Sequence, residues 1–220
     1  MQGKEWERAV RRHLIPQLPG QWRAWTWVMY MEPMDWFTKA VIVSIVHLHI
    51  KVTASVQLLA APRDWWVANL SIHLGGYGRR WPIPSTTVDA ERILDDLAPL
   101  IRAEAVPFFE ENATLDGYLA YLNGRVSDLA EHLGDGGWQD TGVDEELTYL
   151  HLLRGDMVAA EQAASWAERA GLNNGRALAL DRSERVRRTF AAAVEDRSRG
   201  LVILQENAAR MRAKLKLPPA

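Results

Sequence analysis

The chain has 220 residues, of which 48% are hydrophobic and 25% are charged, and its formal net charge is −2. A chain of this size can bury a core of its own, so folding needs neither a metal ion nor a disulfide. The lack of cysteine excludes disulfides, thiol nucleophiles and cysteine-bound zinc, and a charge so near zero indicates no particular partner.

The chain carries no pattern typical of export or of membrane insertion. Residues 1–10 are charged and lack the apolar stretch of a signal peptide. The longest apolar segment, residues 40–50, is shorter than the roughly 20 residues of a membrane span and contains Ser44, His47 and His49. We therefore expect a cytoplasmic protein with no membrane partner.

The first third of the chain predicts a helix followed by a sheet. Residues 4–14 have an amphipathic helical pattern that ends at Pro16 and Pro19. Four segments then alternate or are rich in β-branched and aromatic residues, which is typical of strands: 25–29, 40–53, 55–60 and 66–74. Because the links between them are short and have no helical period, we expect a mostly antiparallel sheet.

Helices are predicted after the glycine- and proline-rich loop 75–84. Thr86 or Thr87 can cap a helix whose apolar residues keep helical spacing as far as Ile101. Residues 106–109 form an apolar connector, and shorter helices are predicted over 115–122 and 128–133.

Residues 144–167 predict two antiparallel helices joined at Arg154-Gly155-Asp156. Gly155 ends the first helix and Asp156 caps the second, which accounts for a tripeptide that also matches a cell-adhesion motif. The pattern resembles one tetratricopeptide-like unit of about thirty residues, but it does not recur, so we do not predict a solenoid.

The last segment, 180–217, has apolar residues at nearly heptad spacing from Val186 to Leu215. Arg197 occupies one position of this seam and Gly200 lies beside it, so we expect a break or kink there. The seam can pack on its own chain or on a second copy, and its two alanines and one charge favour the first. Residues 176–216 hold eleven Lys/Arg and five Asp/Glu, which makes this segment basic on an acidic remainder.

Together these patterns predict an α+β fold in two parts. Residues 1–125 form a domain with a roughly four-stranded, mostly antiparallel sheet and flanking helices. Residues 126–220 form a helical extension, with a helical hairpin and a long basic C-terminal helix.

Three histidines form a candidate metal site. His47 and His49 are two residues apart on one predicted strand and so share a face, and His73 lies on a nearby strand. If they converge, they can bind a divalent ion such as Zn²⁺, with Glu32 or Asp35 as an oxygen ligand. The alternative is a sheet face with half-exposed histidines and no metal, and no other cofactor is predicted.

Two further clusters have simpler explanations. Gly75-Gly76-Tyr77-Gly78 lacks the Gly-Lys-Ser/Thr that follows a phosphate-binding loop, although Arg79 and Arg80 can hold an anion. The acidic runs Glu110-Glu111 and Asp144-Glu145-Glu146 stand at predicted helix starts, where we expect them to be solvated and to complement the helix dipole. No hydrolase, metalloprotease or kinase motif is present.

Ten tryptophans are an unusual number for this length. Large aromatic side chains serve either a core or an interface. If they serve an interface, the candidate interaction residues are Trp25, Trp27, Trp65, Trp66, Arg79, Arg80 and Trp81.

One stretch carries a resemblance to a known class of proteins. Gln57 ends one predicted strand, Asn69 lies in the aromatic-rich strand that follows, and Val106-Pro107-Phe108-Phe109 comes after a helix. In these features residues 1–125 resemble a class of small bacterial domains of unknown function, built from an antiparallel sheet and helices. Some domains of that class look like immunity or adaptor proteins encoded beside toxins.

The first functional hypothesis is a non-enzymatic protein-interaction module, with an immunity-like or adaptor role as its concrete form and self-association through the C-terminal helix as one option. The second is a metal- or ligand-binding protein, or an enzyme, with its site at His47, His49 and His73. The third is a nucleic-acid-associated protein that uses the basic C-terminal helix, although no nucleic-acid-binding module is visible.

Overall fold

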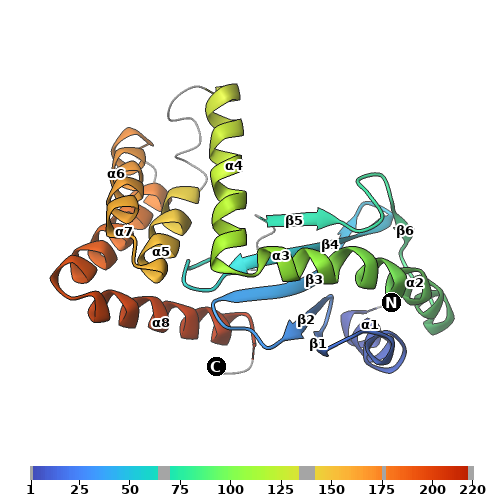
Figure 1. Ribbon diagram of the computed structural model, residues 1–220. Helices are drawn as coiled ribbons and strands as arrows, with labels where there is room; N and C mark the ends of the chain where they lie inside the picture. The colour runs from blue at the N-terminus through green and yellow to red at the C-terminus, as the bar shows by residue number, and fades with distance from the viewer. Residues whose placement is uncertain (1, 64–69, 134–141, 175–176, 218–220) are drawn as a thin grey trace. The chain divides into compact units, whose positions relative to one another are not determined.

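The computed structural model describes residues 2–63, 70–133, 142–174 and 177–217 (Figure 1). The chain divides into two compact units. The sheet unit comprises Met1–Gln57 and Trp66–Thr114, and the helical unit comprises Leu58–Trp65 and Leu115–Ala220. The predicted α+β class is confirmed, and the predicted domain boundary at 125 falls inside a helix, α4 (Leu115–Leu133).

The sheet of the described residues has six strands, in the order β1-β2-β3-β4-β5 with β6 paired to β4. The strands are β1 (Gln21–Trp25), β2 (Val28–Glu32), β3 (Phe37–Val46), β4 (His49–Leu58), β5 (Leu70–His73) and β6 (Trp81–Pro82). The pairs β1–β2, β2–β3, β4–β5 and β4–β6 are antiparallel, as predicted.

The strands are divided differently from the prediction. A turn at His47-Leu48 splits the predicted strand 40–53, and a turn at Thr26-Trp27 separates β1 from β2. Tight hairpin turns usually carry glycine or asparagine where φ is positive. Here Thr26 (φ 51°) and His47 (φ 55°) take those positions, so the usual turn signal is missing from the sequence.

Helices pack on the sheet within the first unit. The chain begins with α1 (Gly3–Ala9), a π-helical turn (Val10–Leu14) and a short 3-10 turn (Ile15–Gln17). After the sheet come α2 (Thr87–Leu100), a second π-helical turn (Ile101–Ala105) and α3 (Val106–Asn112). Helices α1 and α2 lie side by side (Figure 1), and a reciprocal cap between Thr86 and Asp89 starts α2. Apolar side chains from these helices and from the two π-helical turns are buried in the core, whereas the 3-10 turn has no buried residue.

The helical unit continues from α4 with α5 (Val143–Arg154), α6 (Met157–Asn174), α7 (Ala177–Glu195) and α8 (Arg197–Lys214). Helices that follow one another from α4 to α8 pack together in pairs. The predicted hairpin is confirmed, because Gly155 ends α5 in the left-handed conformation (φ 85°) and Asp156 Oδ1 accepts a hydrogen bond of 3.1 Å from Ala159 N in α6.

The predicted break in the C-terminal segment is also found. Asp196 separates α7 from α8 and caps α8 by accepting a hydrogen bond from Ser198 N at 2.8 Å. The two helices approach closely where Gly200 meets Ala193, because a Cβ on Gly200 would lie 2.5 Å from the Ala193 Cβ. Most of the seam is buried in the chain, including Val186 and Leu204. No helix in the described parts of the chain is both long and apolar enough to cross a membrane.

Candidate interaction surface

The three histidines are placed differently from the prediction. His47 lies in the β3–β4 turn and His49 begins β4, so the expectation that both point from one strand face is wrong. His73 ends β5 opposite Thr53, and its Nδ1 lies 3.2 Å from Thr53 Oγ1. Across the residues that the structure describes, no three His, Cys, Asp or Glu side chains are arranged to hold a metal ion.

The loop between β5 and β6 is a well-defined structure. Gly76 N donates to His73 O (3.0 Å), and Arg79 N donates to Gly76 O (3.2 Å), so two turns follow one another. Glu104, in the π-helical turn after α2, accepts a hydrogen bond from Gly75 N at 2.9 Å and ties the loop to that turn. Gly75 and Gly76 both have positive φ, which glycine adopts without strain.

This loop presents one aromatic side chain to solvent. Tyr77 is 79% exposed, although its ring is not isolated. The His73 ring meets it edge-on at 4.9 Å between centroids, and Lys51 Nζ, from β4, lies 5.1 Å from the Tyr77 centroid. A cation over the ring face and an imidazole at its edge are favourable arrangements that hold the ring in place.

The end of the loop brings two arginines to the same region. Arg79 lies over the Trp81 ring at 5.2 Å and forms a 3.5 Å ion pair with Asp96 of α2. Arg80 is exposed. Trp81 pairs with Ile50 in the sheet and is only 4% exposed, so it is a core residue and not the interaction residue that we predicted.

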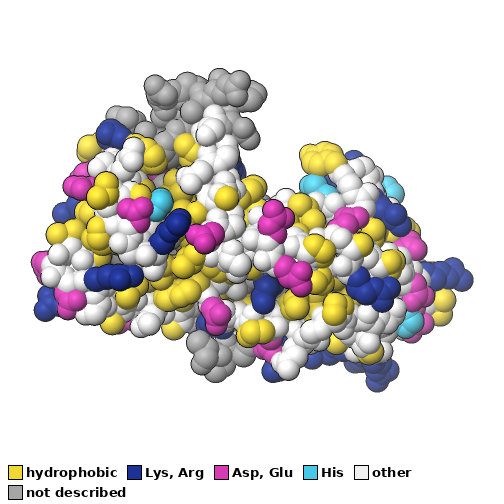
Figure 2. All heavy atoms as spheres, in the orientation of Figure 1, with side chains coloured by type: hydrophobic (Ala, Val, Ile, Leu, Met, Phe, Trp, Pro, Cys, Tyr) yellow, Lys and Arg dark blue, Asp and Glu magenta, His cyan; other side chains and the backbone are white. Residues whose placement is uncertain are grey.

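The β3–β4 turn lies beside this loop, because β6 pairs with the first residues of β4 and sets Pro82 opposite His49. His47, Leu48 and His49 are all exposed there. We call the whole region the basic–aromatic surface, and it comprises His47, Leu48, His49, Lys51, His73, Tyr77, Arg79 and Arg80. In Figure 2, histidine and Lys/Arg side chains lie beside hydrophobic ones in the area where Figure 1 draws this loop.

Trp25 and Trp27 do not extend this surface. Trp27 is half-buried and stacks on Trp6 of α1, with ring centroids 5.3 Å apart and an interplanar angle of 25°. Trp25 is also half-buried, at the end of β1. Trp65 and Trp66 lie outside the described residues.

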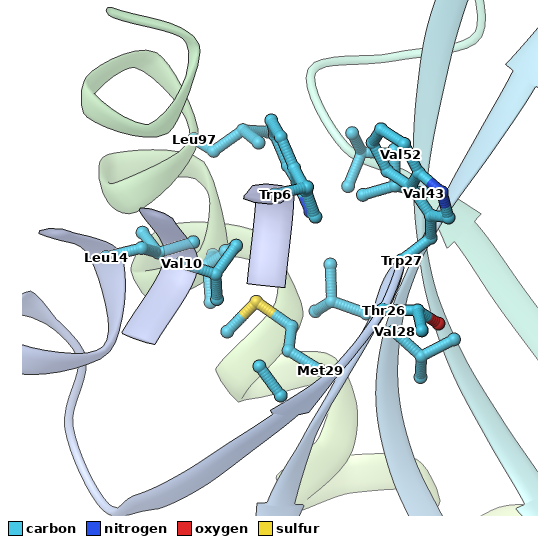
Figure 3. Close-up of a pocket in the computed structure, with 13 residues that line it drawn as sticks. Trp6, Val10, Leu14, Thr26, Trp27, Val28, Met29, Val43, Val52 and Leu97 are labelled. Carbon is cyan, nitrogen blue, oxygen red and sulfur yellow. The ribbon is translucent and has the colours of Figure 1, made fainter. Parts of the chain in front are cut away.

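A small hollow lies in the core of the sheet unit (Figure 3). Its volume is about 10 Å³, which is room for roughly one water molecule. Its lining is almost entirely apolar and includes Trp6, Val43 and Leu97. A hollow so small and so apolar is expected to stay dry, and it is not a ligand site.

A second cluster, which the sequence did not reveal, lies in the helical unit. Asp144, Glu145 and Glu146 start α5 and are at most 1% exposed, so the expectation that they are solvated is wrong. Arg63 bridges two of them, with Nη1 2.8 Å from Glu145 Oε2 and Nη2 2.9 Å from Glu146 Oε1. We call these four residues, together with Arg182 and Arg185, the buried ion cluster.

Other groups complete the hydrogen bonding of this cluster. Arg185 Nε donates to Glu145 Oε1 (3.1 Å), and the hydroxyl of Tyr149 donates to the same oxygen (3.2 Å). The hydroxyl of Tyr118 donates to Glu146 Oε2 at 3.2 Å. Burial and the neighbouring carboxylate raise the pKa of both tyrosines, which keeps them as hydrogen-bond donors.

The third carboxylate of the cluster is less well compensated. Arg182 Nη1 lies 3.9 Å from Asp144 Oδ1, beyond hydrogen-bond distance. Burial raises the pKa of Asp144 to about 6, although the charge of Arg182 opposes that shift. The bonds of this cluster join residues of the helical unit, and they hold Arg63, Tyr118 and Arg185 to the start of α5.

Comparisons with protein-family models, with curated proteins and with solved structures found no match to this chain. Its function is therefore inferred from the geometry of the basic–aromatic surface.

Proposed function

We propose that this chain is a non-enzymatic protein-interaction module that binds a partner protein through the basic–aromatic surface. The observation that carries the proposal is Tyr77, a 79% exposed ring held by Lys51 and His73 on a hydrogen-bonded loop. Tyrosine and arginine are the residues most often found at energetic centres of protein interfaces. A side chain that is already held in place loses little freedom on binding.

Exposed apolar groups beside the loop support a protein as the partner. Leu48, at the tip of the β3–β4 turn, is 79% exposed, and Ile45 near the end of β3 is 52% exposed. Interfaces between proteins often combine apolar and aromatic side chains with cationic ones. An adaptor or immunity-like role in the cytoplasm, in which a partner is held without being chemically altered, is the concrete form of this proposal.

The basic C-terminal segment supports the nucleic-acid alternative less well. Arg182 and Arg185 face Asp144 and Glu145 in the buried ion cluster, and Arg212 is buried. Binding of a nucleic acid requires cationic side chains that are free to contact its phosphate groups. Three of the arginines in this segment are therefore poorly available to a nucleic acid.

The experiment is affinity capture from the native lysate, read by mass spectrometry, with three forms of the chain. The first is the unchanged chain and the second is Tyr77→Ala. The control is Val158→Ala on α6, because Val158 is also 79% exposed but lies in the helical unit. We expect the unchanged chain and the control to capture a stoichiometric partner, and Tyr77→Ala to lose it. The three forms should have equal melting temperatures. Equal retention by all three forms, or no partner at all, would refute the proposal.

A further inference from the structure

We infer that the segment of the partner that meets the basic–aromatic surface is acidic, a carboxylate-rich stretch of polypeptide. This inference rests on the proposed function. Residues 44–53 and 73–84, which supply the surface, contain three Lys/Arg and three His but no Asp or Glu. The remaining charge of the chain is negative, so the surface is a local reversal of sign.

Two acidic side chains contact the loop from the neighbouring helical segments, and both are already engaged. Asp96 pairs with Arg79, and Glu104 accepts the hydrogen bond of Gly75 N. Within the described parts of the chain, neither Lys51 nor Arg80 forms a salt bridge with a carboxylate. These two cations are therefore available to carboxylates from another chain.

The spacing of two hydrogen-bonding side chains, of which Lys51 is cationic, suits an extended segment. His49 and Lys51 are two residues apart on β4, so they point to the same face and are separated by about 6–7 Å. Alternate side chains of an extended peptide have the same spacing. Carboxylates at alternate positions of such a peptide can meet both groups, while the Tyr77 ring supplies a flat apolar contact beside them.

A polypeptide fits this surface better than a nucleic acid does. Single-stranded nucleic acids are bound by several aromatic side chains on which successive bases stack. The basic–aromatic surface exposes one such ring, and the exposed Leu48 beside it offers an apolar contact that a phosphate backbone cannot use. Carboxylates together with apolar groups on the partner match both features.

The test measures binding of a fluorescently labelled glutamate-rich peptide to the full-length chain by anisotropy. A lysine-rich peptide of the same length and a random DNA duplex are the competing probes. The test variant is the double charge reversal Lys51→Glu/Arg80→Glu. The control is Arg187→Glu/Arg188→Glu, which changes the net charge equally at exposed positions of α7. These two double variants and Tyr77→Ala are each compared with the unchanged chain, after their melting temperatures have been shown to match.

We expect the glutamate-rich peptide to bind, and its affinity to fall with rising salt. The Lys51→Glu/Arg80→Glu variant should bind about tenfold more weakly, because two attractive charge pairs become repulsive, while the control is unchanged. Equal weakening in both double variants, or tighter binding of either competing probe, overturns the inference. If the partner captured from the lysate depends on Tyr77 but not on Lys51 and Arg80, the inference fails while the proposed function stands. If Tyr77→Ala retains that partner, the proposed function itself fails.

Discussion

Replacing Arg63 with methionine should strongly destabilise the helical unit. The change keeps much of the apolar stem and removes the guanidinium, which donates hydrogen bonds of 2.8 and 2.9 Å to Glu145 and Glu146. Both carboxylates are at most 1% exposed and cannot turn to water for compensation. Removing one partner of a buried ion pair typically costs about 3–5 kcal/mol, and we expect a loss in that range.

The measurement is equilibrium urea unfolding followed by circular dichroism, with the slope of the transition compared between variants. The control is the double variant Arg63→Met/Glu146→Gln, which also neutralises one of the carboxylates left behind. It should recover stability relative to Arg63→Met alone, because the residual penalty comes from uncompensated buried charge.

A loss below about 1 kcal/mol for Arg63→Met would refute this reasoning, since exposed pairs have that magnitude. So would a double variant less stable than Arg63→Met. Either result would mean that water or another cation compensates the two glutamates.

Three further outcomes can be measured by unfolding experiments. The raised pKa of Asp144, about 6 against 3.8, means that the folded chain binds its proton more tightly than the unfolded chain. Stability contributed by that proton is therefore lost as pH rises from about 4 to 6. Asp144→Asn should flatten this part of the profile of stability against pH, and it should raise the free energy of unfolding by up to about 3 kcal/mol at pH 7. An unchanged profile would contradict this prediction. Trp6→Ala should cost about 3–5 kcal/mol, because Trp6 is 2% exposed and its loss enlarges an apolar hollow; a cost near zero would show that the core collapses around the gap. Gly75→Ala and Gly76→Ala should each lower the melting temperature because both residues have positive φ. Only Gly75→Ala should also change the near-ultraviolet signal of tryptophan, because its Cβ would lie 2.4 Å from Arg79 Cδ and displace that side chain from its ring contact, whereas Gly76 has open space around it.

Features that depend on neighbouring residues were predictable from the sequence. The turn at Gly155-Asp156 and the break beside Arg197 follow from residues within one helical turn, and both are found. The antiparallel sheet followed from short links between β-rich segments. The hairpin turns at Thr26 and His47 were not predictable, because both residues have positive φ, which residues other than glycine seldom adopt.

Features that depend on distant residues were not predictable. Glu145 and Arg63 are 82 positions apart in the sequence, so an acidic run at a helix start gave no sign of its partner. One signal was present: residues 147–153 of α5 are largely apolar and show no polar face, which indicates a helix covered on all sides. On such a helix three consecutive acidic residues cannot all reach water. For the basic–aromatic surface, the sequence supplied Arg79, Arg80 and the histidines, but only the pairing of β4 with β5 and β6 brings Lys51 to Tyr77.

Residues 58–63 belong to the helical unit, although Leu58 is the last residue of β4. Leu58 to Ala61 are fully buried in the finished fold, and Arg63 needs carboxylates that are synthesised about 80 residues later. At a synthesis rate of roughly 5–20 residues per second, the ribosome takes on the order of 4–16 s to make the residues between this apolar segment and those carboxylates. Because of this threading, a single cut after residue 114 keeps the whole sheet unit but separates residues 58–65 from the rest of the helical unit. A fragment that ends near residue 114 would keep the sheet but expose the apolar residues 58–61 to solvent. It would also lack the glutamates that pair with Arg63, so we expect the fragment to aggregate.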